Sequence, residues 1–111
     1  MARRFMRAYI RALRAFNDAT EKGRWKDTAH ANELIGILAK RLEIPAQRVR
    51  AAFPHSVDPD GRVNIAGMKR ELQFFVDQKM VQTQSINVED VVDMQFVEAA
   101  LKELGPYRRA P

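Results

Sequence analysis

The chain has 111 residues, of which 46% are hydrophobic and 30% are charged, and it contains no cysteine. This length fits one domain with a single hydrophobic core, and the composition excludes a disordered tail or a fibre. The absence of cysteine excludes disulfides, thiolate metal sites and thiol nucleophiles. The formal net charge is +5, and the whole excess lies in residues 1–24, which hold seven basic and two acidic residues.

Residues 4–22 are predicted to form an amphipathic helix that ends near Gly23. Six apolar residues fall on one broad face at helical spacing: Phe5, Met6, Tyr9, Ile10, Leu13 and Phe16. The five arginines of this segment fall together on the opposite side: Arg3, Arg4, Arg7, Arg11 and Arg14. The pattern indicates a helix with its apolar face in the core and a strongly basic face outside.

Four more helical segments follow a capping residue or a proline, at 28–42, 46–52, 65–79 and 94–104. The expected caps and starts are Asp27 or Thr28, Pro45, Asn64 and Asp93. A short turn is expected at 88–92, and the Gly-Pro pair at 105–106 ends the last helix. No segment alternates polar and apolar residues between turn signals, so no strand is predicted.

The predicted fold is therefore all-α, with about five helices in a compact bundle. Residues 1–105 are expected to form a single helical domain, and residues 106–111 a frayed C-terminal tail. The longest apolar run covers six residues, 34–39, which is far short of the roughly 18 that a membrane-spanning helix needs. Arginines interrupt every candidate signal-peptide core near the N-terminus, so neither an export signal nor a membrane span is predicted.

No constellation of residues points to catalysis, a metal or a cofactor. The two histidines, His30 and His55, have no second metal-ligating side chain at a suitable spacing, so both are interpreted as surface residues. The loop from Ser56 places oxygen ligands at the first, third and fifth positions of a calcium-binding EF-hand, but its twelfth position is Gly67 instead of a glutamate. This loop is better interpreted as the tight turn Asp58-Pro59-Asp60-Gly61, which precedes the fourth helix. We expect no catalytic residue and no cofactor.

The basic face of the first helix is the strongest physical feature of the sequence. It is the candidate polyanion-binding face, formed by Arg3, Arg4, Arg7, Arg11 and Arg14. Phosphate contact or attachment to an anionic membrane surface would both use such a face. A solvated or partner-facing side of a core helix explains the same pattern and is favoured, because no nucleic-acid-binding motif accompanies the arginines.

Four stretches, taken in order, carry a resemblance to a known family. They are residues 4–13 (RFMRAYIRAL), 33–40 (ELIGILAK), 58–64 (DPDGRVN) with the helix to residue 76, and 91–105 (VVDMQFVEAALKELG). Over residues 4–105 the chain resembles the C-terminal helical part of type-2 periplasmic substrate-binding proteins of ABC importers. The similarity is to the nitrate/sulfonate/taurine type, which includes binders of thiamine-pyrimidine precursors.

The resemblance implies a non-enzymatic role in solute delivery to a membrane permease, and it implies a periplasmic location. No signal peptide is predicted for the chain, so without the resemblance a cytoplasmic location would be expected. Most of the ligand cleft of the family belongs to an α/β portion that this chain lacks, so no ligand-binding residue is transferred to it. The expected partner is that α/β portion or another protein, with a homodimer as a further possibility. The alternative function is an independent basic helical module that binds nucleic acid or another polyanion.

Overall fold

A computed structural model describes residues 1–82 and 85–110, and it confirms the all-α fold with five helices. The helices are α1 (Ala2–Ala19), α2 (Ala29–Leu42), α3 (Ala46–Ala51), α4 (Ile65–Asp77) and α5 (Gln95–Leu104). A single 3-10 turn, η1 (Val88–Val91), lies at the turn expected for 88–92. The predicted caps act at two helix starts, since Thr28 accepts a hydrogen bond from the Ala31 amide and Asn64 accepts one from the Gly67 amide.

The prediction that the chain has no strand is wrong. A hairpin of two very short strands, β1 (Thr20–Glu21) and β2 (Arg24–Trp25), follows α1 directly, so α1 ends three residues earlier than expected. The turn between the strands places both Lys22 and Gly23 at positive φ, which reverses the chain within two residues. Two-residue strands are too short to show an alternating pattern in the sequence.

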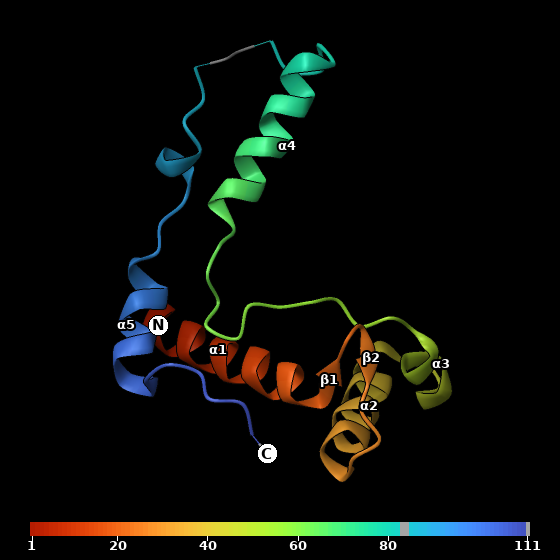
Figure 1. Cartoon of the computed structure of the whole chain (residues 1–111). Coiled ribbons are helices and arrows are strands. Elements are labelled where there is room, and N and C mark those ends of the chain that lie inside the picture. The colour runs from red at the N-terminus through yellow and green to blue at the C-terminus, as the bar shows by residue number, and fades with distance from the viewer. Residues whose placement is uncertain (83–84, 111) are drawn as a thin grey trace.

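The aromatic ring of Trp25 fixes the hairpin in place. Its ring packs edge-on against Phe16 of α1, with the ring centroids 5.3 Å apart. Its indole Nε1–H donates a hydrogen bond to the Val49 carbonyl of α3, at 3.0 Å. The hairpin therefore joins α1 to the α2–α3 pair, which lies at one end of α1 in Figure 1.

The main core lies between α1 and α5. Ile10, Val97 and Ala100 are buried there, with Met6, Met94, Leu101 and Leu104 packed around them. Ile10 is the only large side chain in the described part of the chain that is completely buried. A second, smaller packing unit joins α2 and α3 through Ala31, Ile35 and Val49.

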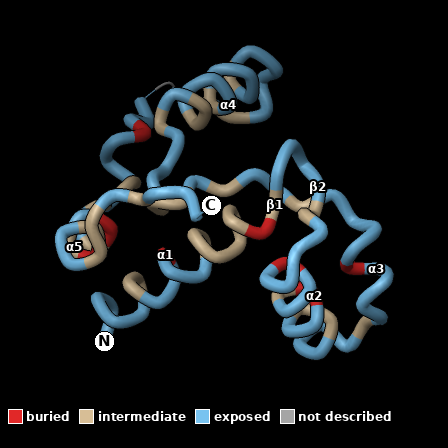
Figure 2. Tube along the Cα trace, turned by 60° about the horizontal axis from the view of Figure 1, so that its bottom comes forward, coloured by how far each residue is buried: buried red, intermediate tan, exposed pale blue. Residues whose placement is uncertain are grey.

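Helix α4 stands away from this core. It packs chiefly on η1, which returns beside it, and none of its residues is buried (Figures 1 and 2). The radius of gyration is 17.2 Å, whereas a closely packed chain of this length has a value of about 13 Å. The arrangement leaves large apolar side chains of α1 and α4 exposed to solvent.

Helix α1 buries only part of the apolar face that the sequence predicts: Ile10 is buried, and Met6, Leu13 and Phe16 are half-buried. Phe5 and Tyr9 belong to the predicted core face, but they are 68% and 47% exposed and stack on each other. Helix α5 packs against the edge of the apolar face that contains Ile10. At about 100° per residue, Phe5 lies roughly 140° around the helix from Ile10, whereas Met6 and Arg14 each lie about 40° from it. The outer part of the aromatic stripe is therefore uncovered.

Gly61 holds the Asp58–Gly61 turn against the core, and its replacement by alanine is expected to destabilise the fold. Gly61 has φ +69°, and a Cβ there would lie 3.2 Å from Ile10 Cγ1. The left-handed conformation alone costs alanine about 1–2 kcal/mol. Gly23→Ala is the matched control, because Gly23 has φ +73° but no atom within 4 Å of its Cβ position. Urea denaturation followed by circular dichroism should show the larger loss for Gly61→Ala; equal losses would contradict the close packing.

Candidate functional site

The structure divides the five arginines of the candidate polyanion face into two groups. Arg7 and Arg14 bind within the chain, on the border between α1 and α5. Arg7 Nη1 lies 2.6 Å from Glu103 Oε2 of α5, although both side chains are about half exposed. The other group consists of Arg3, Arg4 and Arg11, which are exposed and make no hydrogen bond or ion pair within residues 1–82 and 85–110.

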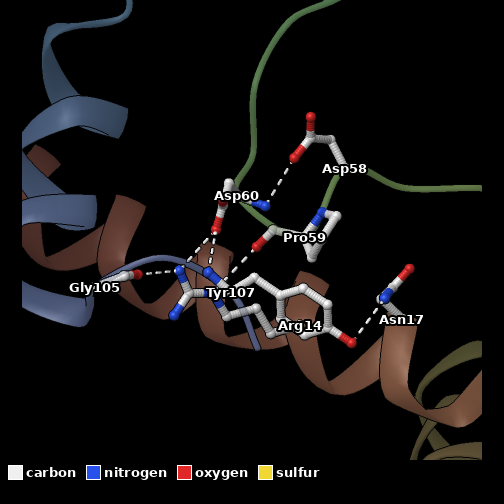
Figure 3. Close-up of polar contacts among 7 residues, drawn as sticks. All are labelled: Arg14, Asn17, Asp58, Pro59, Asp60, Gly105 and Tyr107. Atoms are coloured by element: carbon white, nitrogen blue, oxygen red, sulfur yellow. Dashed lines mark hydrogen bonds and ion pairs between the residues drawn. The ribbon is translucent and has the colours of Figure 1, made fainter. Parts of the chain in front are cut away.

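The guanidinium of Arg14 is the centre of a polar junction between three segments (Figure 3). Its Nη2 lies 2.8 Å from Asp60 Oδ1 and 2.5 Å from the Gly105 carbonyl oxygen, and its Nε donates to the Pro59 carbonyl at 3.2 Å. The side chains of Arg14 and Asp60 are only 17% and 19% exposed, so solvent screens their interaction less than at the surface. The junction ties α1 to the turn before α4 and to the end of α5.

The same junction explains the acidic turn that was compared with an EF-hand. Asp58 Oδ1 accepts the Asp60 amide at 2.8 Å, which is a side-chain-capped turn of the kind expected here. Asp60 Oδ1 accepts from Arg14 and from the Tyr107 amide, at 3.1 Å. Both carboxylates therefore bind protein donors, and no group of three or more metal-ligating side chains occurs among the described residues.

The C-terminal tail, expected to be frayed, is bound to α1 over residues 107–110; residue 111 lies outside the described part. The Tyr107 hydroxyl donates a hydrogen bond to Asp18 and accepts one from Asn17 Nδ2, at 2.9 Å. Arg109 Nη2 donates to the Thr20 carbonyl, also at 2.9 Å. The only sequence signal for this contact is a tyrosine two residues after the helix-ending Gly105, and by itself that signal is too weak to predict it.

Ionisation of Tyr107 is expected to release the tail at alkaline pH. Burial raises the pKa of the Tyr107 phenol above its usual value of about 10, and the hydrogen bond to Asp18 raises it further. Because the folded state favours the neutral phenol, its contribution to stability is present below pH 10 and is lost as the pH rises through the raised pKa. Tyr107→Phe should remove this loss and cost about 1 kcal/mol at neutral pH.

Two measurements check this expectation. Near-ultraviolet tyrosinate absorbance should show a late ionisation in the wild-type protein that is missing in Tyr107→Phe. Urea denaturation at neutral pH and at pH about 11 should then give a smaller pH effect for Tyr107→Phe than for the wild-type protein. An identical pH effect in both proteins would show that another group is responsible.

The histidines do not form a site. His30, at the start of α2, has its Nε2 3.0 Å from the Ala15 carbonyl oxygen of α1, so it joins the two helices instead of facing a ligand. His55 lies exposed in the loop before the turn, far along the chain from any other histidine. Neither histidine belongs to a group of three or more candidate metal ligands in the part of the chain that the structure describes.

An open crevice of about 360 Å³ lies where α1, the turn and the start of α5 meet. Its lining is mainly apolar and includes Met6, Tyr9, Val63, Met94 and Val97. No titratable residue with a shifted pKa points to acid–base chemistry there: the lowered pKa of Asp93 is caused by its hydrogen bonds to Gln95, at the start of α5. The crevice therefore has the character of a docking surface for apolar groups.

Two pairs of exposed aromatic side chains lie on α1 and on α4. One is Phe5 with Tyr9 on α1, where the rings stack with centroids 6.2 Å apart. The other is Phe74 with Phe75 on α4, where the rings meet edge-on at 5.7 Å. Phe74 is 57% exposed and Phe75 is 41% exposed, and neither lines the space between α4 and η1. The helical periodicity of the sequence did not predict that either pair is exposed. It shows that a helix has an apolar face, but it does not show which other segment packs on that face.

No helix in the described residues is long and apolar enough to cross a membrane. Comparisons with protein-family models, with curated proteins and with solved structures found no match to this chain.

Proposed function

We propose that the chain is the non-enzymatic C-terminal helical portion of a solute-binding protein of ABC importers, of the nitrate/sulfonate/taurine type. It would act in the periplasm beside an α/β portion that supplies most of the ligand cleft. The observation that carries this proposal is the imbalance between buried and exposed apolar residues. Among the described residues, eight apolar residues are buried, three of them alanines, whereas twelve large apolar side chains are exposed. A self-sufficient domain buries more of its large apolar side chains than this.

The placement of the four resembling stretches also supports the proposal. They fall on α1, on α2, on the Asp58–Gly61 turn with α4, and on the segment from the end of η1 through α5, so each stretch contains one main helix. The junction around Arg14 joins α1, the turn before α4 and the end of α5, so the helix of the first stretch is held to the third and fourth stretches by one set of contacts.

The sequence of the DNA around the coding region tests this proposal directly. We expect an α/β coding sequence directly upstream and genes for a permease and an ATPase beside it. The α/β polypeptide should form a complex with the chain when the two are produced together, and the complex should bind a small anionic or thiamine-precursor solute. Neither an α/β coding sequence nor transporter genes in the neighbourhood would count decisively against the proposal.

The alternative, a polyanion-binding module, now rests on three arginines. Arg3, Arg4 and Arg11 have no acidic partner in the described chain, whereas Arg7 and Arg14 do. If this surface binds DNA or RNA, the logarithm of the binding constant should fall with the logarithm of salt concentration with a slope of about −3. Neutralising Arg3, Arg4 and Arg11 should abolish binding; no binding at low salt would reject this function.

A further inference from the structure

The surface area of the chain is too large for a molecule of its mass. It is 8889 Å² at 12.8 kDa, whereas a compact monomer of this mass exposes about 6,300 Å². The surplus is therefore about 2,600 Å² per chain. Obligate homodimers bury about 1,000–2,500 Å² on each chain, so an interface at the upper end of this range would remove nearly all of this surplus.

Two parts of the molecule carry five of the twelve large apolar side chains that are exposed among the described residues. The first is the α1 strip, which we define as Phe5 and Tyr9. The second is the α4 arm, which we define as α4 with η1 and which carries the exposed Phe74, Phe75 and Val91. Within one chain the α4 arm rises away from α1 and leaves the crevice beside Tyr9 open (Figure 1). The strip and the arm are therefore both available to another molecule.

The charges of these two parts are opposite in sign. Helix α1 has five basic residues and one acidic residue, a net charge of +4. The α4 arm has two basic and four acidic residues, a net charge of −2. Lys69 pairs with Glu89 inside the arm, which leaves Glu71, Asp77 and Asp90 exposed without a cationic partner in the described residues. Arg3, Arg4 and Arg11 of α1 are unpaired cations of the opposite sign, and Arg70 is an exposed cation within the arm itself.

We propose that the chain forms a reciprocal homodimer, in which the α4 arm of each copy covers the α1 strip and the adjacent crevice of the other. A two-fold axis makes the two contacts identical, so each basic α1 meets an acidic arm and each aromatic pair meets another. The aromatic pairs form the apolar centre of the interface and the unpaired charges its rim. The inference concerns the chain produced by itself and does not rest on the proposed transport function, although both draw on the exposed apolar residues; in a complex with an α/β portion, that partner would compete with the second copy for them.

The mass of the purified chain in solution provides the first test. Light scattering after size exclusion should give twice 12.8 kDa at micromolar concentration. Phe74→Glu should raise the dissociation constant at least about tenfold, because it puts a charge at the apolar centre. Ile37→Glu is the matched control, since Ile37 is 49% exposed on α2, outside the proposed interface, and it should leave the dimer intact. Circular dichroism should show that both variants keep their helices.

Single cysteines test the reciprocal geometry, and the natural chain contributes no background because it has no cysteine. Mixing Tyr9→Cys with Phe74→Cys under mild oxidation should give a mixed disulfide dimer. Each variant alone should give little cross-linking. A monomer at about 100 µM would overturn the proposal, as would equal effects of Phe74→Glu and Ile37→Glu. Preferential cross-linking of Tyr9→Cys to itself would overturn the reciprocal arrangement.

Discussion

Replacing Ile10 by alanine is expected to lower the free energy of unfolding by about 3 kcal/mol. Ile10 has no exposed surface and packs against Val97 and Ala100 of α5. The substitution removes the apolar contacts of three carbon atoms and leaves a cavity that the rigid α1–α5 pair cannot close. No other large side chain in the described residues is completely buried, so no other single truncation should cost as much.

The measurement is urea denaturation, followed by circular dichroism, of Ile10→Ala beside Ile37→Ala. Ile37 is the matched control because it is also an isoleucine in a helix but is half exposed, so its truncation should cost less than about 1 kcal/mol. Natural domains are stable by only about 5–15 kcal/mol, so Ile10→Ala could unfold this chain altogether. Ile10→Val, with an expected loss of about 1 kcal/mol, then provides a measurable smaller step. Equal losses at positions 10 and 37 would show that the core does not lie between α1 and α5.

Local signals in the sequence predict the helices well. Thr28 and Asn64 are side-chain caps whose partners lie only three residues away, so the sequence contains all of the information needed. The same holds for the end of α5 at Gly105, which adopts φ +70°. These features depend on neighbours along the chain and not on how the helices pack.

Features that depend on distant contacts could not be predicted in the same way. The apolar stripe of α1 is broad, and its pattern does not say which edge α5 will cover; the structure buries Ile10 and leaves Phe5 exposed. The pattern likewise does not say which arginines of α1 will contact another segment and which will stay in solvent. Arg14 lies only about 40° from Ile10 around the helix, so it reaches α5 and the turn, while Arg11 remains in solvent. Contacts between segments that lie more than 40 residues apart, such as Arg14 with Asp60, leave no periodic signal.

Replacing Arg14 by methionine is expected to lower the free energy of unfolding by about 2 kcal/mol. Methionine keeps an apolar stem of similar length, so the loss comes from the polar junction. The variant leaves Asp60 with only the Tyr107 amide as a donor and leaves the Pro59 and Gly105 carbonyls without the guanidinium. The variant leaves the Asp60 side chain, which is about four-fifths buried, without its counter-charge. The free-energy cost of an unpaired buried charge is larger than the stabilisation that an exposed ion pair provides.

Arg14→Lys and Arg11→Met complete the test. A lysine keeps the charge but cannot hold three acceptors in fixed directions, so Arg14→Lys should recover only about half of the loss. Arg11→Met removes the same charge from an exposed position on the same helix and should cost less than about 0.5 kcal/mol. A double-mutant cycle with Asp60→Asn should give a coupling energy of at least about 1 kcal/mol. If the cycle gives none and Arg14 behaves like Arg11, the arginines of α1 form one solvated basic face, as the sequence alone suggested.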